Sequence, residues 1–246
     1  MDEAAVFRRQ LVAGMKLAIM QPYFLPYIGY FQLIAAVDQF VIYDQIKYTK
    51  KGWINRNRYL LNGADAMFSL PLKKGSDSLE VVERELAPDF DRSKLLSQFA
   101  GAYRRAPQFE PTFALLERIV RHADNNLFRY IHHSVAALCG HLGLGTELRV
   151  SSTLPFDNDL KGQDKVLAIC QAAGADHYIN SMGGAELYAK PDFAARGTPL
   201  QFLKPRPFEY PQFGQPFVPW LSIVDVLMFN PIEAVCACLD HNHDLV

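Results

Sequence analysis

Short apolar runs alternate with segments of helical periodicity along most of the chain, which is the pattern of a parallel α/β sheet. Buried strands are predicted at residues 17–20, 39–43, 147–151, 175–180 and 200–203. Helices are predicted at residues 28–35, 162–173, 183–188 and 220–228 and from residue 231 onward. The first two strands and the helix between them form a βαβ unit, whose crossover should be right-handed.

A hairpin and a helical region interrupt this alternation. Asn62-Gly63, a dipeptide typical of β-hairpins, separates strand-like segments at residues 53–61 and 66–72. A short exposed strand is also expected at residues 79–86. Apolar residues recur at helical spacing in residues 93–103, 111–123 and 125–142. We therefore expect one α/β domain over residues 15–246, with a helical subregion at about 91–143 and an N-terminal extension of residues 1–14.

Composition narrows the function classes. The 246 residues are 50% hydrophobic and 21% charged, and the net charge of -1 gives no general attraction to nucleic acid. No stretch approaches the roughly 20 apolar residues that span a bilayer, and the N-terminus lacks the pattern of a secretory signal. The four cysteines stand in helical segments and are expected to be reduced. We expect a cytoplasmic protein that binds neither nucleic acid nor membranes, and a homo-oligomer is compatible with the sequence.

The loop between the first strand and the first helix is rich in proline and aromatic residues. Gln21 and Pro22 stand at the end of a strand, where ligands bind in open α/β sheets. Tyr27 and Tyr30 are three residues apart and should share a helix face, so both hydroxyls could meet one ligand. Gly29 costs a helix about 1 kcal/mol relative to Ala and usually permits a close approach. These residues predict a pocket, with core packing of the aromatic rings as the alternative.

A cluster of cations follows the second strand. Lys51, Arg56 and Arg58 stand close in sequence to Trp53 and Asn55. Guanidinium groups bind phosphate through paired hydrogen bonds, and the two arginines alternate onto one face of the predicted strand. The segment is therefore predicted to hold a phosphate or carboxylate group, with a solvated basic loop as the alternative.

Glycine and hydroxyl groups also follow a later strand. Ser181, Gly183 and Gly184 come directly after residues 175–180 and are predicted to contact a phosphate at the same edge of the sheet. Asp225 is the sole charged residue of the apolar helix predicted at residues 220–228. A buried carboxylate of this kind is a candidate base or cation ligand, or else a carboxylate held by capping or an ion pair.

Metal signatures are weak in this sequence. Asp157 and Asp159 are compatible with a Mg²⁺ ion that accompanies a substrate phosphate, but two carboxylates in a loop are little evidence. A Cys/His cluster near the C-terminus matches no common zinc pattern, so no protein metal site is predicted. A P-loop, a G-x-G-x-x-G loop and a serine nucleophile elbow are missing from the sequence.

The spacing Tyr27-Ile28-Gly29-Tyr30 resembles the His-x-Gly-His signature of nucleotidylyltransferases and class I aminoacyl synthetases, which also opens the first helix. The resemblance implies a HUP/nucleotidylyltransferase-like parallel sheet flanked by helices. Tyrosine is neutral at pH 7 and cannot supply the charge of an imidazolium, so the signature argues for nucleotide binding more than for adenylyl transfer.

Several motifs in order make the chain resemble the WbqC-like family from Met15 to about Asn230. The motifs are Ala18-Ile19-Met20-Gln21-Pro22-Tyr23-Phe24-Leu25-Pro26-Tyr27-Ile28-Gly29-Tyr30-Phe31, Gly52-Trp53-Ile54-Asn55-Arg56-Asn57, Leu70-Pro71-Leu72, Lys161-Gly162 and Leu221-Ser222-Ile223-Val224-Asp225-Val226-Leu227. Members are bacterial proteins often encoded among genes for surface polysaccharides or modified sugars. The resemblance implies a transferase that moves an acyl or aminoacyl group onto an amino sugar.

Together these patterns predict a transferase that acts on a phosphate-bearing small molecule, either a nucleotide or a nucleotide-linked amino sugar. Tyr27, Tyr30 and Asp225 are the candidate catalytic residues. The cofactor stays open, with a nucleotide and Mg²⁺ as the candidate. Two alternatives remain: a non-catalytic ligand-binding or scaffold protein of a biosynthetic complex, and an ATP-dependent ligase resembling pantothenate synthetase.

Overall fold

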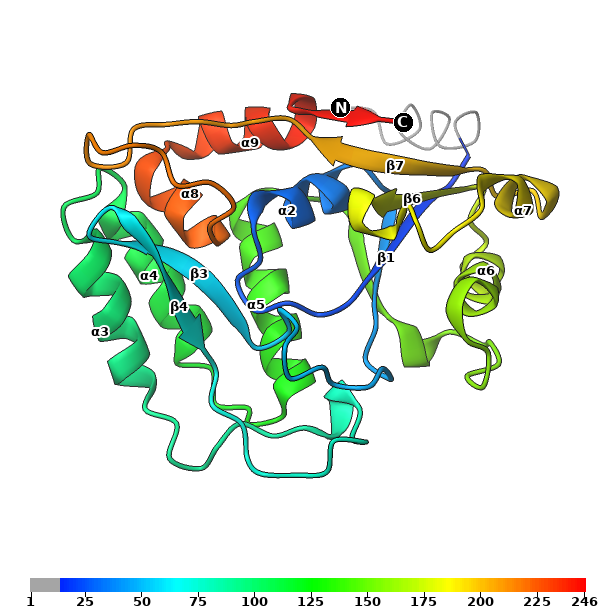
Figure 1. Ribbon diagram of the computed structural model, residues 1–246, viewed down its shortest axis with the longest axis horizontal. Helices are drawn as coiled ribbons and strands as arrows, with labels where there is room; N and C mark the ends of the chain where they lie inside the picture. Colours follow the sequence, from blue (N-terminus) through cyan, green and yellow to red (C-terminus); the bar gives the residue numbers. More distant parts are fainter. Residues whose placement is uncertain (1–13) are drawn as a thin grey trace.

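The computed structural model describes residues 14–246 and contains a six-stranded sheet with helices on both faces (Figure 1). The strand order is β5-β2-β1-β6-β7-β8, and every pairing is parallel except that of β7 with β8. The strands are β1 (Lys16–Met20), β2 (Gln39–Ile42), β5 (Glu147–Val150), β6 (His177–Ser181), β7 (Leu200–Pro205) and β8 (His243–Leu245). The mixed α/β fold with a mostly parallel sheet is thus confirmed.

Alternation of side chains along β1 divides the core into two layers. Leu17 and Ile19 pack on one face with α6 (Gly162–Ala173) and with Phe193 of α7 (Lys190–Ala195). Ala18, between them, packs on the other face with the larger apolar cluster. That cluster also takes in residues of α2 (Ile28–Ala35), α8 (Ile223–Phe229) and α9 (Ile232–His241). A strand that is apolar at consecutive positions is therefore covered on both faces, as parallel strands are.

The hairpin and the helical region form a second layer beside the sheet (Figure 1). Strands β3 (Arg56–Leu61) and β4 (Ala64–Ser69) pair antiparallel around Asn62, whose φ of 53° suits the turn. The helices of this layer are α3 (Arg92–Tyr103), α4 (Phe109–Val120) and α5 (Leu127–His141). Both the predicted hairpin and the predicted helical region are confirmed, with small shifts of their bounds.

Three local predictions differ from the structure. Residues 79–86 contain the 3-10 turn η1 (Val81–Glu83) and only isolated β-bridges instead of a strand, and Val81 is fully buried. Residues 183–188 hold only the end of the 3-10 turn η3 (Met182–Gly184), and α7 follows it. The strand at 200–203 is not the last, since β8 pairs with β7 through tertiary contact. Alternation within three residues is too short a signal to predict such an edge strand.

Three further expectations concern the chain as a whole. The proposed extension at residues 1–14 lies, except for Gly14, outside the described residues. None of the helices formed by residues 14–246 is long and apolar enough to cross a membrane. All four cysteines are free thiols, and burial raises the pKa of Cys139 and of Cys170 to about 12.

Candidate functional site

Two adjoining cavities lie beside the loops that follow the carboxyl ends of β1 and β7. The larger, about 480 Å³, is lined by residues 205–210 of the segment after β7 together with Tyr27, Phe217 and Trp220. The smaller, about 220 Å³, is lined by the residues Tyr23, Pro26, Tyr27, Trp53, Asn57, Arg58 and Trp220. Because both cavities share Tyr27 and Trp220, we treat them as one site and call it the aromatic cleft.

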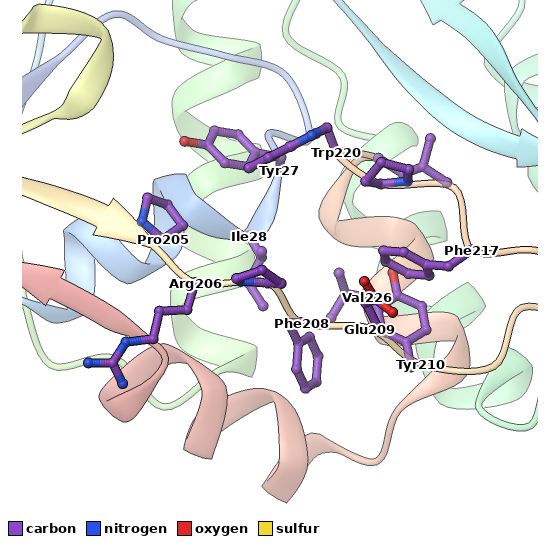
Figure 2. Close-up of a pocket in the computed structure, with 13 residues that line it drawn as sticks. Tyr27, Ile28, Pro205, Arg206, Phe208, Glu209, Tyr210, Phe217, Trp220 and Val226 are labelled. Atoms are coloured by element: carbon purple, nitrogen blue, oxygen red, sulfur yellow. The ribbon is translucent and has the colours of Figure 1, made fainter.

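The rings of Tyr27 and Trp220 line both cavities and lie close together (Figure 2). Their centroids lie 6.1 Å apart with an edge-to-face tilt of 64°. Trp220 is 61% exposed and has a φ of 60°, a left-handed conformation that is unfavourable for a bulky side chain. Strained backbone of this kind is concentrated at functional sites, where the surrounding contacts maintain it.

Hydrogen bonds to Leu25 hold three segments together beneath the cleft. Its carbonyl accepts bonds from Asn57 Nδ2 at 2.9 Å and from Ser222 Oγ at 2.7 Å. Ser222 N also donates to the Arg58 carbonyl at 2.9 Å. Leu25 itself is fully buried with a φ of 46°. The β1–α2 loop, strand β3 and the start of α8 are thereby fixed relative to one another, which positions Tyr27, Arg58 and Trp220.

Gly29 allows the Tyr27 ring to lie against helix α2. A Cβ at position 29 would come within 2.4 Å of Tyr27 Cε2, so only glycine accommodates this ring position. The predicted close approach is therefore real, and the approaching group is a side chain of the protein. Burial raises the pKa of Tyr27, so its hydroxyl is protonated and can donate a hydrogen bond.

Tyr30 does not reach the cleft. Its side chain is 1% exposed, and its hydroxyl donates to the Gln21 carbonyl at 3.0 Å. The prediction that both tyrosine hydroxyls face one ligand is therefore wrong for Tyr30, which is a core residue. Gln21 accepts a bond from Tyr23 at 3.1 Å, and neither Gln21 nor Pro22 lines either cavity.

The predicted cation cluster is divided by the structure. Arg58 lines the cleft: one Nη donates to the Trp220 carbonyl at 3.2 Å and the other lies 3.3 Å from Asp65. Its Nε is buried and has no hydrogen-bond partner within residues 14–246. The Arg58 Cζ lies 5.8 Å from the centroid of the Trp53 ring, which forms the adjacent wall.

The other members of this cluster have structural contacts. The Arg56 guanidinium donates to the carbonyls of Lys51 and Gly52 and lies over Trp53, so it holds the loop in place. Lys51 is exposed and lines neither cavity of the cleft. Asn55 is buried, accepts from Tyr48 and donates to the Leu70 carbonyl. Of the two arginines in the predicted cluster, Arg58 and not Arg56 therefore lines the cleft.

Asp225 is fully buried behind the cleft. Its carboxylate accepts bonds from Tyr103 at 2.9 Å and from Tyr210 and Gln212 at 2.7 Å each. Burial raises its pKa, and the three donors oppose that rise. Asp225 lines neither cavity, so the prediction of a catalytic base or cation ligand is corrected. It is a positioning residue that anchors the segment carrying Tyr210, whose ring lines the larger cavity.

The loops after the other parallel strands lie at the same sheet edge but outside the cleft. Ser181 Oγ is 4.0 Å from Met20 Sδ, and neither Gly183 nor Gly184 lines either cavity. A Cβ on Gly184 would lie 2.4 Å from Asn180 Nδ2, so this glycine serves local packing.

The described residues contain no group of three His, Cys, Asp or Glu side chains able to hold a metal ion. Asp157 accepts a hydrogen bond from the backbone of Asp159, which is a local loop contact. The larger cavity instead offers one carboxylate among its lining residues in the described chain, that of Glu209. Arg206 also contributes to the lining, but its guanidinium pairs with Asp244 and points away from the centre of the cavity (Figure 2).

Sequence reasoning missed the segment after β7 as part of the site. Its five prolines indicate an extended loop, and its aromatic residues Phe208, Tyr210 and Phe217 form much of the larger cavity. Proline together with recurring aromatic residues could have indicated a pocket-lining loop here, because the same combination led to that prediction for the loop after β1.

Comparison with known proteins places this site in a family context. The model of the WbqC-like protein family matches residues 21–237, and the chain belongs to that family. A relative is the uncharacterized protein Rv1507c of Mycobacterium tuberculosis, which is 30% identical over 229 residues. The match covers 87% of this chain and 93% of that protein.

Proposed function

We propose that the protein is a transferase that binds a nucleotide-linked amino sugar in the aromatic cleft and moves an acyl or aminoacyl group onto its amine. The single observation that carries this proposal is the position of Arg58 in the lining of the smaller cavity, together with Trp220 and Tyr27. An arginine N–H group supplies a charge-assisted hydrogen bond to phosphate. Flat aromatic rings provide apolar surfaces on which a base or a sugar ring can stack.

The shape of the cleft supports a ligand with two parts. The smaller cavity is lined by Arg58 and Trp53 and suits the phosphate together with one of the two ring systems attached to it. The larger cavity contains Phe208, Tyr210 and Phe217 and has room for a second ring. A nucleotide-linked sugar has a phosphate bridge between two ring systems, and its bridge would lie beside the rings of Tyr27 and Trp220.

Transfer to an amine requires a base, and Glu209 is the group in the cleft that suits this role. The attacking amine forms a bond to the acyl carbon and must lose a proton, while the leaving group departs with the electron pair of the bond that breaks. Glu209 lines the larger cavity with an exposed carboxylate (Figure 2). It replaces Asp225 as the candidate base in this proposal.

Strand order supports the expected likeness to HUP-type nucleotide-binding folds. Taken in chain order, the five parallel strands lie in the sequence 3-2-1-4-5, as in doubly wound sheets that bind nucleotides. In such sheets the ligand sits at the carboxyl ends of strands near the point where the strand order reverses. That point lies between β1 and β6, and Tyr27 belongs to the loop after β1.

A non-catalytic ligand-binding protein is the second candidate. The burial of Asp225 and Tyr30 favours it, because two of the three residues first considered for catalysis are removed from the cleft. Both candidates predict ligand binding at Arg58. They differ in that only the transferase turns its ligand over and requires Glu209 to do so.

Thermal-shift and calorimetric titrations with ATP, CoA, UDP-sugars and dTDP-sugars test the binding step. A ligand at 100 times its Kd should stabilise the folded protein by about 2.7 kcal/mol. Arg58→Gln should reduce this shift strongly, whereas Arg104→Gln, at an exposed position after α3, should leave it unchanged. The proposal is wrong if none of these phosphate-bearing ligands binds.

Glu209→Gln separates a transferase from a binding protein. With an amino-sugar nucleotide as acceptor and an acyl-CoA as donor, the wild type should release CoA and form an amide. The variant should retain the affinity for the sugar nucleotide and lose most of the turnover. Binding without turnover in the wild type would favour the non-catalytic candidate. Exchange of pyrophosphate into ATP would instead identify a ligase.

A further inference from the structure

Another cavity, with a basic lining, lies between the loop after β2, the segment after β4 and turn η1. Its volume is about 600 Å³, and residues 69–75 line it together with Tyr48, Lys50, Asn55 and Arg84. We call it the basic cavity. It shares no lining residue with the aromatic cleft, so it is a separate place on the molecule.

Arg84 is a buried cation without an anionic partner. It is 5% exposed, and its Cζ lies 4.6 Å from the centroid of the Tyr48 ring. Its Nε is buried and unbonded, and within residues 14–246 its guanidinium takes part in no ion pair and no side-chain hydrogen bond. A charged group removed from water is unfavourable unless it is paired, and contact with one ring only partly compensates. The missing partner would be an anion in the basic cavity.

The other charges around the cavity leave an excess of positive charge. Lys50 pairs with Asp77 at 2.6 Å, and Lys73 pairs with Glu85 at 2.7 Å. Arg84 and Lys74 have no carboxylate partner in the part of the chain that the structure describes. Two unpaired cations therefore face a cavity whose described lining includes no acidic residue.

Gly75 keeps the space beside Arg84 open. A Cβ at this position would lie 3.0 Å from Arg84 Nη1 and 2.9 Å from Leu79 Cδ1. The absence of a side chain at Gly75 thus leaves room for the Arg84 guanidinium at the lining of the cavity.

We propose that the basic cavity binds the phosphoryl group of a small phosphomonoester. A phosphomonoester dianion matches the two unpaired cations in charge, and its oxygens can accept paired hydrogen bonds from the Arg84 fork. Lys74 supplies the second charge from the exposed rim. The volume of the cavity leaves room for the organic part of the molecule beyond the phosphate. This site is independent of the function proposed for the aromatic cleft.

Isothermal titration with inorganic phosphate tests the site directly. Arg84→Lys keeps the charge and removes the planar fork, and it should weaken phosphate binding at least about tenfold. Lys74→Gln, at an exposed position, should weaken binding severalfold without affecting folding. Lys94→Gln on α3, a matched loss of charge, should bind phosphate as the wild type does. Succinate should bind much more weakly than phosphate.

Each contrary result overturns the proposal. It is wrong if the wild type does not bind phosphate, or if Arg84→Lys and Lys74→Gln both bind with unchanged affinity. It is also wrong if Arg58→Gln abolishes binding, since phosphate would then occupy the aromatic cleft. Equal affinity for succinate would exclude a phosphoryl-specific site. If Arg84→Lys does not fold, the result with Lys74→Gln decides.

Discussion

Replacement of Asp225 by asparagine tests whether this carboxylate is structural. The change keeps the size of the side chain but leaves a single acceptor oxygen opposite three donors, Tyr103, Tyr210 and Gln212. If the asparagine oxygen takes the place that bonds Tyr210 and Gln212, the amide NH₂ faces the Tyr103 hydroxyl. That hydroxyl already accepts from Leu60 N, and its proton would lose its acceptor.

The loss of stability caused by Asp225→Asn follows from the number of buried polar groups that are left without a hydrogen-bond partner. One buried donor without an acceptor costs about 1–3 kcal/mol, and the neutral amide is easier to bury than a carboxylate. We therefore expect Asp225→Asn to lower the free energy of unfolding by about 2 kcal/mol at pH 7. The matched control Asp240→Asn, on the exposed face of α9, should change it by less than about 0.5 kcal/mol.

The difference in unfolding free energy between the wild type and Asp225→Asn should change with pH in a definite direction. Burial raises the pKa of Asp225 in the folded protein above its ordinary value of 3.8. At pH values between the ordinary pKa and the folded-state pKa, the folded state therefore binds more protons than the unfolded state. The contribution of Asp225 to stability is therefore fully present below the ordinary pKa and declines as pH rises through the folded pKa. The gap between wild type and Asp225→Asn should narrow as pH rises over this interval.

Urea unfolding followed by circular dichroism, between pH 4 and pH 7, measures these quantities. A double-mutant cycle with Tyr103→Phe should give a coupling energy of about 1 kcal/mol, because both changes remove the hydrogen bond between Tyr103 and Asp225. Equal unfolding free energies for wild type and Asp225→Asn at every pH, with no coupling to Tyr103, would refute the view that this carboxylate is structural.

Three further predictions concern the cleft and the surface. Gly29→Ala should displace the Tyr27 ring, because its Cβ would lie 2.4 Å from that ring, and calorimetry should detect weaker ligand binding although no lining side chain is removed. The free energy of unfolding of Trp220→Gly should be about 1 kcal/mol higher than that of Trp220→Ala, because alanine is strained in the left-handed conformation and glycine is not. Equal free energies of unfolding would show that the backbone at this position is unstrained. Hydrogen bonds from Arg129 lower the pKa of Asp124 to about 2, so its contribution to stability is present above the ordinary value of 3.8 and is lost as pH falls toward 2. Asp124→Asn should remove that acid-side loss, and identical acid titrations of variant and wild type would contradict this assignment.

Local sequence patterns predicted most of the fold because they report burial. The consecutive apolar residues of β1 and β2 indicate strands covered on both faces, and Asn62-Gly63 indicates the hairpin turn. The pairing of β8 with β7 depends on contacts between distant segments. Its three residues carry no periodicity of their own, so the sequence could not indicate it.

The candidate site was only partly predictable, for a related reason. The loop after β1 was expected to line a pocket, and Tyr27, Trp53 and Arg58 do so. Arg56 and Tyr30 have the same chemistry as Arg58 and Tyr27, but their hydrogen bonds go to backbone carbonyls. Residue type and spacing cannot distinguish a side chain that faces a ligand from one that satisfies the protein itself.

The sequence by itself determined the α/β class, the order of most elements and membership in the WbqC-like family, because these depend on periodicity and on motifs within short segments. Tertiary structure alone decided which residues share the cleft. Trp220 comes next to Tyr27 from the opposite end of the chain, held there by Ser222 and Asn57 on the carbonyl of Leu25. Asp225 became a buried anchor because three donors from other segments converge on it, and such convergence is a property of packing that no local pattern contains.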